Sequence, residues 1–365
     1  MKKIIIIGAG FAGLTALSRL YNYGKKGELE ITLINDKQQS SFLPMLPDCL
    51  GRGVAPEHLM LDLAALSKKK NFNFIKDKVI SLDLAKKEVS TSALNLQYDF
   101  LLIASGSETN FYGNDEIRKT AFKLDNAQDA ASLRRALDEK DYDSYLVVGG
   151  GYTGIEVATN IRVYLKKRKV DKRIVVIERA PSILGPLPEW TKSYVLANLK
   201  RLGIEVLTNT SIEKVAGFAN PMLIWAAGVR TSDFIQNLNV GKNSQGRLKT
   251  DEYLRVNDSC LAAGDAAYFS HKNNFLRMAV QFAIMQGSCA AGNIIRQARG
   301  KSLAKYKPVD LGLIIPLANN QACGIILGIN MRGCLPVLFH YIMCVYRTYG
   351  FRNKLGIVKD LITGR

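Results

Sequence analysis

The chain carries two copies of one short pattern, and this repetition constrains the fold more than any other feature. KKIIIIGAGFAG at 2–13 and YLVVGGGYTG at 145–154 each place an apolar run before G-x-G-x-x-G, and each continues into a helical pattern. Neither run alternates polar and apolar residues, which is typical of strands buried in a parallel sheet. The sequence therefore predicts the α/β class with two Rossmann-like dinucleotide-binding domains.

The first copy has its glycines at Gly8, Gly10 and Gly13. In such a turn the first glycine permits a sharp bend, the second lets backbone N–H groups approach a pyrophosphate, and the third allows close helix–strand packing. The next apolar run, EITLIN, ends at Asn35 and is followed by Asp36. A polar oxygen there accepts from ribose hydroxyls, and we divide this predicted contact between the two residues.

The second copy has Gly149, Gly151 and Gly154, and its next strand, RIVVI, leads into Glu178. A carboxylate at this place favours the 2′-hydroxyl of NADH over the 2′-phosphate of NADPH, although the adjacent Arg179 weakens that preference. A single glycine motif also occurs in ordinary turns, but two complete copies argue against that reading. Two dinucleotides, FAD and NADH, imply hydride transfer from nicotinamide to flavin.

Composition leaves several classes open. The 365 residues have a formal charge of +18 and a pI near 9.6, which suits nucleic acid or an anionic membrane, but no segment resembles a nucleic-acid module. The six cysteines include no C-x-x-C, and with three histidines no metal site is expected. Because no signal-peptide pattern precedes the first strand, we expect a cytoplasmic, reducing compartment.

Three further segments resemble one known family. YDFLLIASGSETNFYG (98–113), LIWAAGVR (223–230) and YLRVNDSCLAAGDAAYF (253–269) are similar to signatures of type II NADH dehydrogenases. These are single-chain NADH:quinone oxidoreductases of the FAD-dependent pyridine nucleotide-disulphide oxidoreductase superfamily. The resemblance implies a flavoprotein of the respiratory chain that passes two electrons from NADH to a menaquinone or ubiquinone without pumping protons.

The resemblance also implies site residues. The Gly264–Asp265 pair matches the family pair whose carboxylate holds the ribityl chain of FAD. Small residues that end buried strands let the backbone lie against a flat cofactor, with an ordinary turn as the alternative. Such residues are Ala104, Ser105 and Gly106 on the FAD side and Gly228 on the NADH side.

The residues that contact the quinone are expected on a helix near 276–294, where the family carries Ala-Gln-x-Ala-x-Gln-x-Gly. Gln281 matches the first glutamine, but Met285 stands at the second, and Gln286 follows one place later. One residue turns a side chain by about 100° around a helix, so Gln286 does not simply replace it. Gln281 and Gln286 are the candidate quinone-side residues, with a polar helix surface as the alternative. Glu156 matches a family carboxylate that either delivers a proton or holds a cation.

The C-terminal segment is apolar and then basic. Cys334–Tyr346 is 13 residues long, whereas a spanning helix needs about 20. Basic and apolar residues alternate beyond it, as in helices that lie in the headgroup plane, and YGFRNKL resembles the family's anchoring tail. We therefore expect a monotopic enzyme on the cytoplasmic face of the inner membrane. A docking or homodimer helix is the alternative.

The predicted domains are an FAD domain at 1–108 and 256–330, an NADH domain at 109–255, and a membrane-anchoring or dimer region at 331–365. Two rival functions stay open. A sulfide:quinone oxidoreductase needs cysteines on both sides of the flavin, and only Cys323 lies near an expected position, since no cysteine occurs between Cys49 and Cys260. The other rival is a flavin-binding sensor or scaffold with low turnover.

Overall fold

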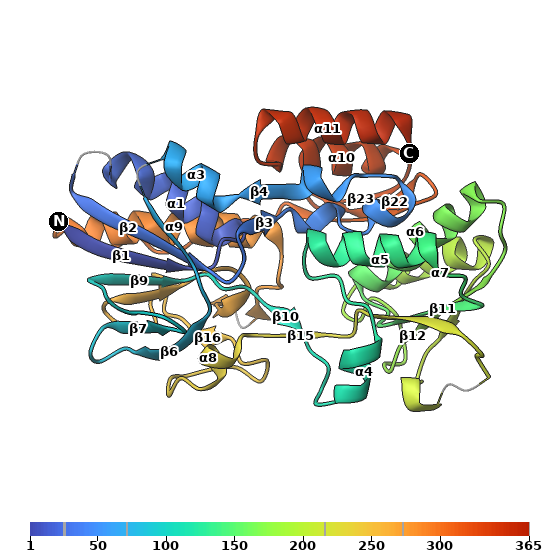
Figure 1. Cartoon of the computed structure of the whole chain (residues 1–365), viewed down its shortest axis with the longest axis horizontal. Coiled ribbons are helices and arrows are strands. Elements are labelled where there is room, and N and C mark those ends of the chain that lie inside the picture. Colours follow the sequence, from blue (N-terminus) through green and yellow to red (C-terminus); the bar gives the residue numbers. More distant parts are fainter. Residues whose placement is uncertain (25–26, 71, 215–216, 272–273, 365) are drawn as a thin grey trace. The chain divides into compact units, whose positions relative to one another are not determined.

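The computed structural model describes residues 1–24, 27–70, 72–214, 217–271 and 274–364. The chain forms two compact units (Figure 1). Unit 1 comprises 1–40, 61–108 and 229–310, and unit 2 comprises 41–60, 109–228 and 311–365. Four short strands lie where the chain passes between the units: β3 (Gln39–Ser41), β4 (Met60–Asp62), β10 (Glu108–Thr109) and β15 (Val229–Arg230).

Unit 1 contains a parallel sheet and several smaller ones. Its strands are β1 (Lys2–Ile7), β2 (Leu29–Asn35), β5 (Asn73–Lys76), β6 (Val79–Asp83), β7 (Glu88–Thr91), β8 (Asn95–Gln97), β9 (Phe100–Ile103), β16 (Leu248–Lys249), β17 (Cys260–Ala262), β18 (Ala267–Tyr268), β19 (Ser270–His271) and β20 (Asn274–Phe275). Its helices are α1 (Phe11–Gly24), α3 (Leu63–Lys69), α8 (Asp233–Gln236) and α9 (Val280–Ala298). The main sheet has the order β17-β9-β1-β2-β5, with all pairs parallel, and β6-β7-β8 form an antiparallel sheet.

The main sheet of unit 1 explains the unbroken apolar run at the N-terminus. Ile4 to Ile7 are all buried because β1 is a central strand covered on both faces. Helices α1 and α9 pack closely, and a Cβ on Gly287 would collide with the main-chain oxygen of Ala12. The glycine therefore sets how near α9 comes to the start of α1.

Unit 2 repeats this plan with a four-stranded parallel sheet. Its strands are β11 (Ser144–Val148), β12 (Arg173–Ile177), β13 (Ile204–Leu207), β14 (Pro221–Trp225), β21 (Gly312–Leu317), β22 (Gln321–Ile326) and β23 (Ile329–Gly333). Its helices are α2 (Asp48–Gly51), α4 (Asp115–Thr120), α5 (Ala127–Glu139), α6 (Tyr152–Lys167), α7 (Glu189–Arg201), α10 (Leu335–Arg347) and α11 (Phe351–Thr363). The parallel order is β13-β12-β11-β14, and β21-β22-β23 are antiparallel. The predicted α/β fold with two parallel sheets is thus confirmed.

The C-terminal segment forms two helices within unit 2. Helices α10 and α11, red in Figure 1, contact each other, and α10 also packs on β21, β22 and β23. No helix in the described ranges combines the length and apolar character needed to cross a membrane. The compact units divide the chain at other residues than the predicted functional domains, because 41–60 and 311–365 both pack within unit 2. The functional boundaries stay a prediction.

Candidate functional site

The glycine turn of unit 1 follows β1 at the carboxyl edge of the parallel sheet. Gly8 has φ +100°, and a Cβ there would collide with the main chain of Ala104 at the end of β9. A Cβ on Gly13 would collide with the Gly8 carbonyl, which makes the third glycine a packing requirement. Gly10 differs because no atom lies within 4 Å of its Cβ position. The second glycine thus faces open space, where a bound group can approach the backbone.

Unit 2 reproduces this geometry residue for residue. Gly149 has φ +112°, and its Cβ position meets the main chain of Ala226 at the end of β14. A Cβ on Gly154 would collide with the Gly149 carbonyl, whereas no atom lies within 4 Å of the Cβ position of Gly151. No side chain caps the start of α6 at Gly151. Both turns therefore have the form that accepts a pyrophosphate at a helix N-terminus.

The strand-end side chains hold the two turns in shape. Asn35 Oδ1 accepts a hydrogen bond from Ala9 N–H at 2.9 Å, and its Nδ2 donates to Lys37 O at 2.8 Å. Glu178 accepts from Gly150 N–H and from Ala180 N–H, both at 2.7 Å. Asn35 and Glu178 therefore occupy equivalent positions beside the glycine turns of unit 1 and unit 2.

The sequence predicts the ribose contact at Asn35 and Asp36, two neighbouring residues of unit 1. Asn35 is half-buried and bonded to the glycine turn, whereas Asp36 is exposed. The division of the ribose contact between Asn35 and Asp36 stays a prediction. The carboxylate of Asp36 is left at the surface of unit 1.

The small residues after β9 border the same edge of unit 1. Ala104 is buried beside Gly8, and Gly106 has φ +70° with nothing within 4 Å of its Cβ position. The Ser105 Oγ is buried and has no hydrogen-bond partner among the described residues. A buried polar atom without a partner needs a ligand or water, so this edge fits a polar cofactor.

Gly264 and Asp265 complete the edge in unit 1. Gly264 has φ +71°, and its Cβ position lies 3.2 Å from the Ala12 Cβ and 3.5 Å from the Ala283 Cβ. The Asp265 carboxylate accepts from Ser107 Oγ at 2.9 Å. Burial raises the pKa of Asp265, an effect that Ser107 and a nearby arginine oppose. The predicted FAD residues of unit 1 therefore lie around the carboxyl edge of its sheet, and their contact with FAD stays a prediction.

Two residues missed in the sequence support this edge. Ser107 bonds the Asp265 carboxylate, and Arg247 is buried, with its guanidinium donating to the main-chain oxygens of Asp265, Ala267 and Leu276. Burial lowers the pKa of Arg247. No motif marks Arg247, and Ser107 lies within the segment 98–113 without an assigned role, because the partners of both residues are set by the folded chain.

The two glutamines of α9 have different surroundings. Gln286 is buried, and its Oε1 accepts from Gly264 N–H at 2.7 Å, so it fixes the Gly264 turn. Gln281 is also buried, and its Nε2 donates to Asp310 Oδ1 at 2.9 Å, where Arg277 donates as well. Met285 is half-buried. The quinone-side role of both glutamines stays a prediction.

Gly228 and Glu156 are the remaining predicted residues of unit 2. Gly228 has φ +83°, and a Cβ there would collide with the Tyr112 hydroxyl. Glu156 is half-buried on α6, just beyond its first turn, and its pKa is raised well above the ordinary value by burial and by the nearby Asp48. In the described part of the chain, no ion pair to Glu156 is formed within 4.0 Å.

The C-terminal helices carry an apolar surface, which we call the apolar face. Helix α11 is held by polar contacts: Asp360 lies 2.6 Å from His58 Nδ1 and accepts from Ala55 N–H at 2.9 Å, and Asn353 donates to Met60 O. Its exposed side chains include apolar ones as well as Arg352 and Lys359. The apolar face consists of Leu335, Leu338, Phe339, Ile342, Met343, Tyr346, Phe351, Leu355, Val358 and Ile362, all exposed.

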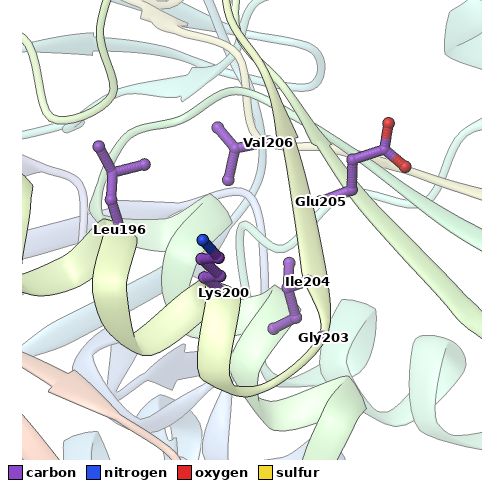
Figure 2. Close-up of a pocket in the computed structure, with 6 residues that line it drawn as sticks. All are labelled: Leu196, Lys200, Gly203, Ile204, Glu205 and Val206. Carbon is purple, nitrogen blue, oxygen red and sulfur yellow. The ribbon is translucent and has the colours of Figure 1, made fainter.

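A pocket elsewhere on unit 2 does not coincide with these residues. Its volume is about 450 Å³, and side chains of α7 and β13 line it (Figure 2). Its lining includes Gly203 and Ile204 at the amino end of β13, whereas ligands of parallel sheets bind at the carboxyl ends. No predicted site residue lies there.

Candidate metal ligands and thiols were compared with the same residues. Within the described ranges, no group of three or more His, Cys, Asp or Glu side chains is placed to hold a metal ion. All six cysteines are free thiols. Burial raises the pKa of Cys49 and raises that of Cys323 to about 12, so both stay protonated near neutral pH and are poor nucleophiles.

Comparisons with known proteins agree with this geometry. Residues 2–287 match the model of the family described as pyridine nucleotide-disulphide oxidoreductase. Type II NADH:quinone oxidoreductases of Staphylococcus aureus and Staphylococcus saprophyticus are 28% and 26% identical, over 91% of both chains. The structure of NDH2 from Plasmodium falciparum in complex with NADH is similar in fold, with a TM-score of 0.85, 18% identity and coverage of 99% of this chain and 98% of that one.

A sulfide:quinone oxidoreductase from Aquifex aeolicus has a similar fold as well. Its TM-score is 0.78 at 18% identity, with coverage of 98% of this chain and 92% of that one. Both structural neighbours are only 18% identical to this chain. They therefore establish the fold and do not decide whether the electron donor is NADH or sulfide.

Proposed function

Because the chain belongs to the pyridine nucleotide-disulphide oxidoreductase family, we propose that it is a flavin-dependent NADH:quinone oxidoreductase. One observation carries this proposal: both units have a complete glycine turn in which the second glycine alone faces open space. Two intact turns suit two dinucleotides. The staphylococcal relatives, which carry this activity in their names, match along 91% of both lengths.

Unit 1 would hold FAD. The backbone around Gly10 suits the pyrophosphate, Asn35 suits the adenosine ribose, and the Asp265 carboxylate with Ser107 suits the hydroxyls of the ribityl chain. The unpartnered Ser105 hydroxyl supplies a further hydrogen bond. A flavin bound there supplies a ring that accepts the hydride of NADH and passes two electrons onward.

Unit 2 would hold NADH. The open backbone at Gly151 receives the pyrophosphate, and the α6 N-terminus adds the positive end of a helix dipole. Glu178, bonded to the glycine turn, would contact the ribose, where a carboxylate repels a 2′-phosphate, so NADH would be the preferred donor. Gly228 keeps the backbone after β14 clear of side chains.

The acceptor would be a quinone drawn from a membrane. The balanced reaction converts NADH, one proton and quinone into NAD⁺ and quinol. Polar contacts hold the inner side of α11 while the apolar face points outward, an arrangement that suits the lipid surface. Exposed Arg352 and Lys359 would face anionic headgroups. We therefore propose a peripheral enzyme on the cytoplasmic side of the membrane, with homodimerisation through the apolar face as the alternative.

The test of this function is a donor and acceptor matrix with purified, FAD-loaded protein. NADH, NADPH and sulfide are each paired with a soluble menaquinone analogue and a ubiquinone analogue, and quinol formation is followed. We expect turnover with NADH and a quinone. Turnover with sulfide alone would identify the rival sulfide:quinone oxidoreductase, and no turnover with any pair would favour the sensor.

A further inference from the structure

An exposed tyrosine lies at the carboxyl edge of the parallel sheet of unit 2. Tyr112 is 60% exposed, although the preceding Phe111 is buried and stacks on Trp225 with the ring centroids 5.9 Å apart. Tyr112 also has φ +52°, in the left-handed region that residues other than glycine seldom adopt. Packing in the core of unit 2 does not explain the position of this side chain, and such backbone conformations concentrate at ligand-binding sites.

The loop that carries Tyr112 is fixed to the end of β14. Asn110 N–H donates to the Gly228 oxygen at 3.2 Å, and Trp225 Nε1 donates to the Asn110 oxygen at 2.9 Å. Asn110 Oδ1 accepts from the Tyr112 N–H at 2.9 Å. The Tyr112 hydroxyl lies so close to Gly228 that a Cβ on this glycine would collide with it. These contacts hold the Tyr112 backbone in place and leave its ring exposed.

The Tyr112 ring also reaches the end of a second strand. The Arg179 guanidinium lies over this ring, with its Cζ 5.8 Å from the ring centroid. Arg179 follows Glu178 beyond β12, whereas Gly228 follows β14, and β11 lies between these two strands in the sheet. Tyr112 therefore contacts residues on both sides of β11, the strand that leads into the glycine turn proposed for NADH.

The ring and the guanidinium have nearly the spacing that a planar base requires. Atoms in van der Waals contact lie about 3.5 Å apart, so a base held between two flat groups needs about 7 Å between them. The observed 5.8 Å is about 1 Å less than this. Because Tyr112 and Arg179 are both exposed, rotation of the long arginine side chain can supply the opening. Aromatic rings and guanidinium planes are both surfaces on which bases stack.

We propose that the adenine base of the dinucleotide donor stacks between the Tyr112 ring and the Arg179 guanidinium. This inference rests on the proposed function, in which Glu178 contacts the adenosine ribose. The base is bonded to that ribose, and Arg179 is the next residue in the chain. Tyr112 and Arg179 are positioning residues, because they hold the adenosine half of the donor and take no part in hydride transfer. The preference for a dinucleotide over a nicotinamide mononucleotide therefore depends on this pair.

The test compares two donors that differ in the adenosine half. Reduced nicotinamide mononucleotide has the nicotinamide half of NADH and no adenosine. Stopped-flow reduction of the flavin in FAD-loaded protein gives a dissociation constant and a limiting rate for each donor. We expect Tyr112→Ala to raise the dissociation constant for NADH at least about fivefold, the lower end for loss of one base–aromatic stack, with the limiting rate unchanged. The dissociation constant for the mononucleotide should not change.

Three further variants separate stacking from other causes. Tyr112→Phe keeps the ring and should bind NADH as the wild type does. Arg179→Ala should weaken the binding of NADH and leave that of the mononucleotide unchanged. Tyr21→Ala is the matched control, because Tyr21 of unit 1 also has a cation over its ring, Lys70 Nζ at 5.0 Å, and it should bind both donors normally. Equal losses with both donors, or unchanged NADH binding, in Tyr112→Ala or Arg179→Ala would overturn the proposal.

A second readout does not depend on flavin reduction. ADP-ribose contains the adenosine half and the pyrophosphate of NADH and no nicotinamide ring. Calorimetric titration of FAD-loaded protein should find ADP-ribose binding at least about fivefold weaker in Tyr112→Ala than in the wild type. Equal affinity in the two proteins, or no binding to the wild type, would overturn the adenine site. A wild-type flavin that NADH does not reduce would instead contradict the proposed function, and the ADP-ribose titration would still decide on the adenine site.

Discussion

Asn35 and Glu178 occupy equivalent positions in unit 1 and unit 2. Asn35 is the last residue of β2, and Glu178 directly follows β12. Each accepts a hydrogen bond from the backbone N–H of the residue after the first glycine, which is Ala9 at 2.9 Å in unit 1 and Gly150 at 2.7 Å in unit 2. The side chains differ in charge. Only the second turn therefore carries a carboxylate bonded in this way, which suits a donor with an unmodified ribose.

Glu178→Gln should weaken discrimination against NADPH. The two carboxylate oxygens accept one bond each, from Gly150 N–H and from Ala180 N–H, so the amide keeps one of these bonds and loses the negative charge. We expect the KM for NADH to rise about tenfold, equivalent to about 1.4 kcal/mol, and the ratio of NADH to NADPH efficiency to fall. Steady-state kinetics with both donors measure this, with Glu205→Gln on β13 as the control. An unchanged ratio would remove Glu178 from the ribose site.

Alanine at the glycines should separate binding from folding. Gly10→Ala places a Cβ in open space, so the protein should fold with an unchanged unfolding midpoint and lose FAD. Gly13→Ala should unfold unit 1, because its Cβ collides with the Gly8 carbonyl. Flavin content and thermal unfolding report both effects. Full flavin content in Gly10→Ala would place the pyrophosphate elsewhere.

Gly151→Ala is the corresponding change in unit 2. Its Cβ also enters open space, so we expect normal folding, full flavin content and a KM for NADH raised at least about tenfold. Loss of flavin with normal NADH binding would mean that the two cofactors are assigned to the wrong units.

The stability of unit 2 should depend on the charge of Asp48. The folded-state pKa is about 6 against an ordinary value of 3.8, so stability is full below pH 3.8 and falls as pH rises through 6. The free energy of unfolding should fall by about 3 kcal/mol, because each unit of pKa difference corresponds to about 1.36 kcal/mol. The Asp48→Asn variant should not show this loss. Chemical denaturation should therefore find that its free energy of unfolding, relative to that of the wild type, is higher at pH 7 than at pH 4. An identical pH dependence in both proteins would contradict the assigned pKa.

The apolar face should bind lipid. Phe351 and Ile362 are 75% and 80% exposed, and burying each in a bilayer would contribute about 1.5–3 kcal/mol. Phe351→Glu and Ile362→Glu should therefore lower partitioning into anionic vesicles at least about tenfold, measured by co-sedimentation. Ile80→Glu, at an exposed site in unit 1, is the control. If the variants instead lose a dimer in sedimentation velocity, the apolar face is a protein interface.

The sequence predicts those parts of the molecule that local patterns encode. The turns at Gly8 and Gly149 were predictable because a positive φ and close backbone packing demand glycine at fixed spacings, and the buried strands before them lack alternation. Residues brought together by packing left no such pattern. Tyr341 and Asp48 lie 293 positions apart and meet through the docking of α10.

The glutamine motif near 276–294 also did not predict which side chains of α9 face unit 1's glycine turns. Gln286 turned out to bond the Gly264 N–H, which depends on how α9 rests on α1 at Gly287. The C-terminal helices were predicted as an amphipathic tail, but the polar contacts of Asp360 and Asn353 that leave the apolar face outward required the folded chain.

The most direct measurement is anaerobic stopped-flow mixing of FAD-loaded protein with NADH, followed by mixing of the reduced protein with a menaquinone analogue. We expect NADH to bleach the flavin absorbance within the time of one turnover and the quinone to restore it. A flavin that NADH leaves oxidised, while sulfide bleaches it, would contradict the proposed NADH:quinone oxidoreductase function.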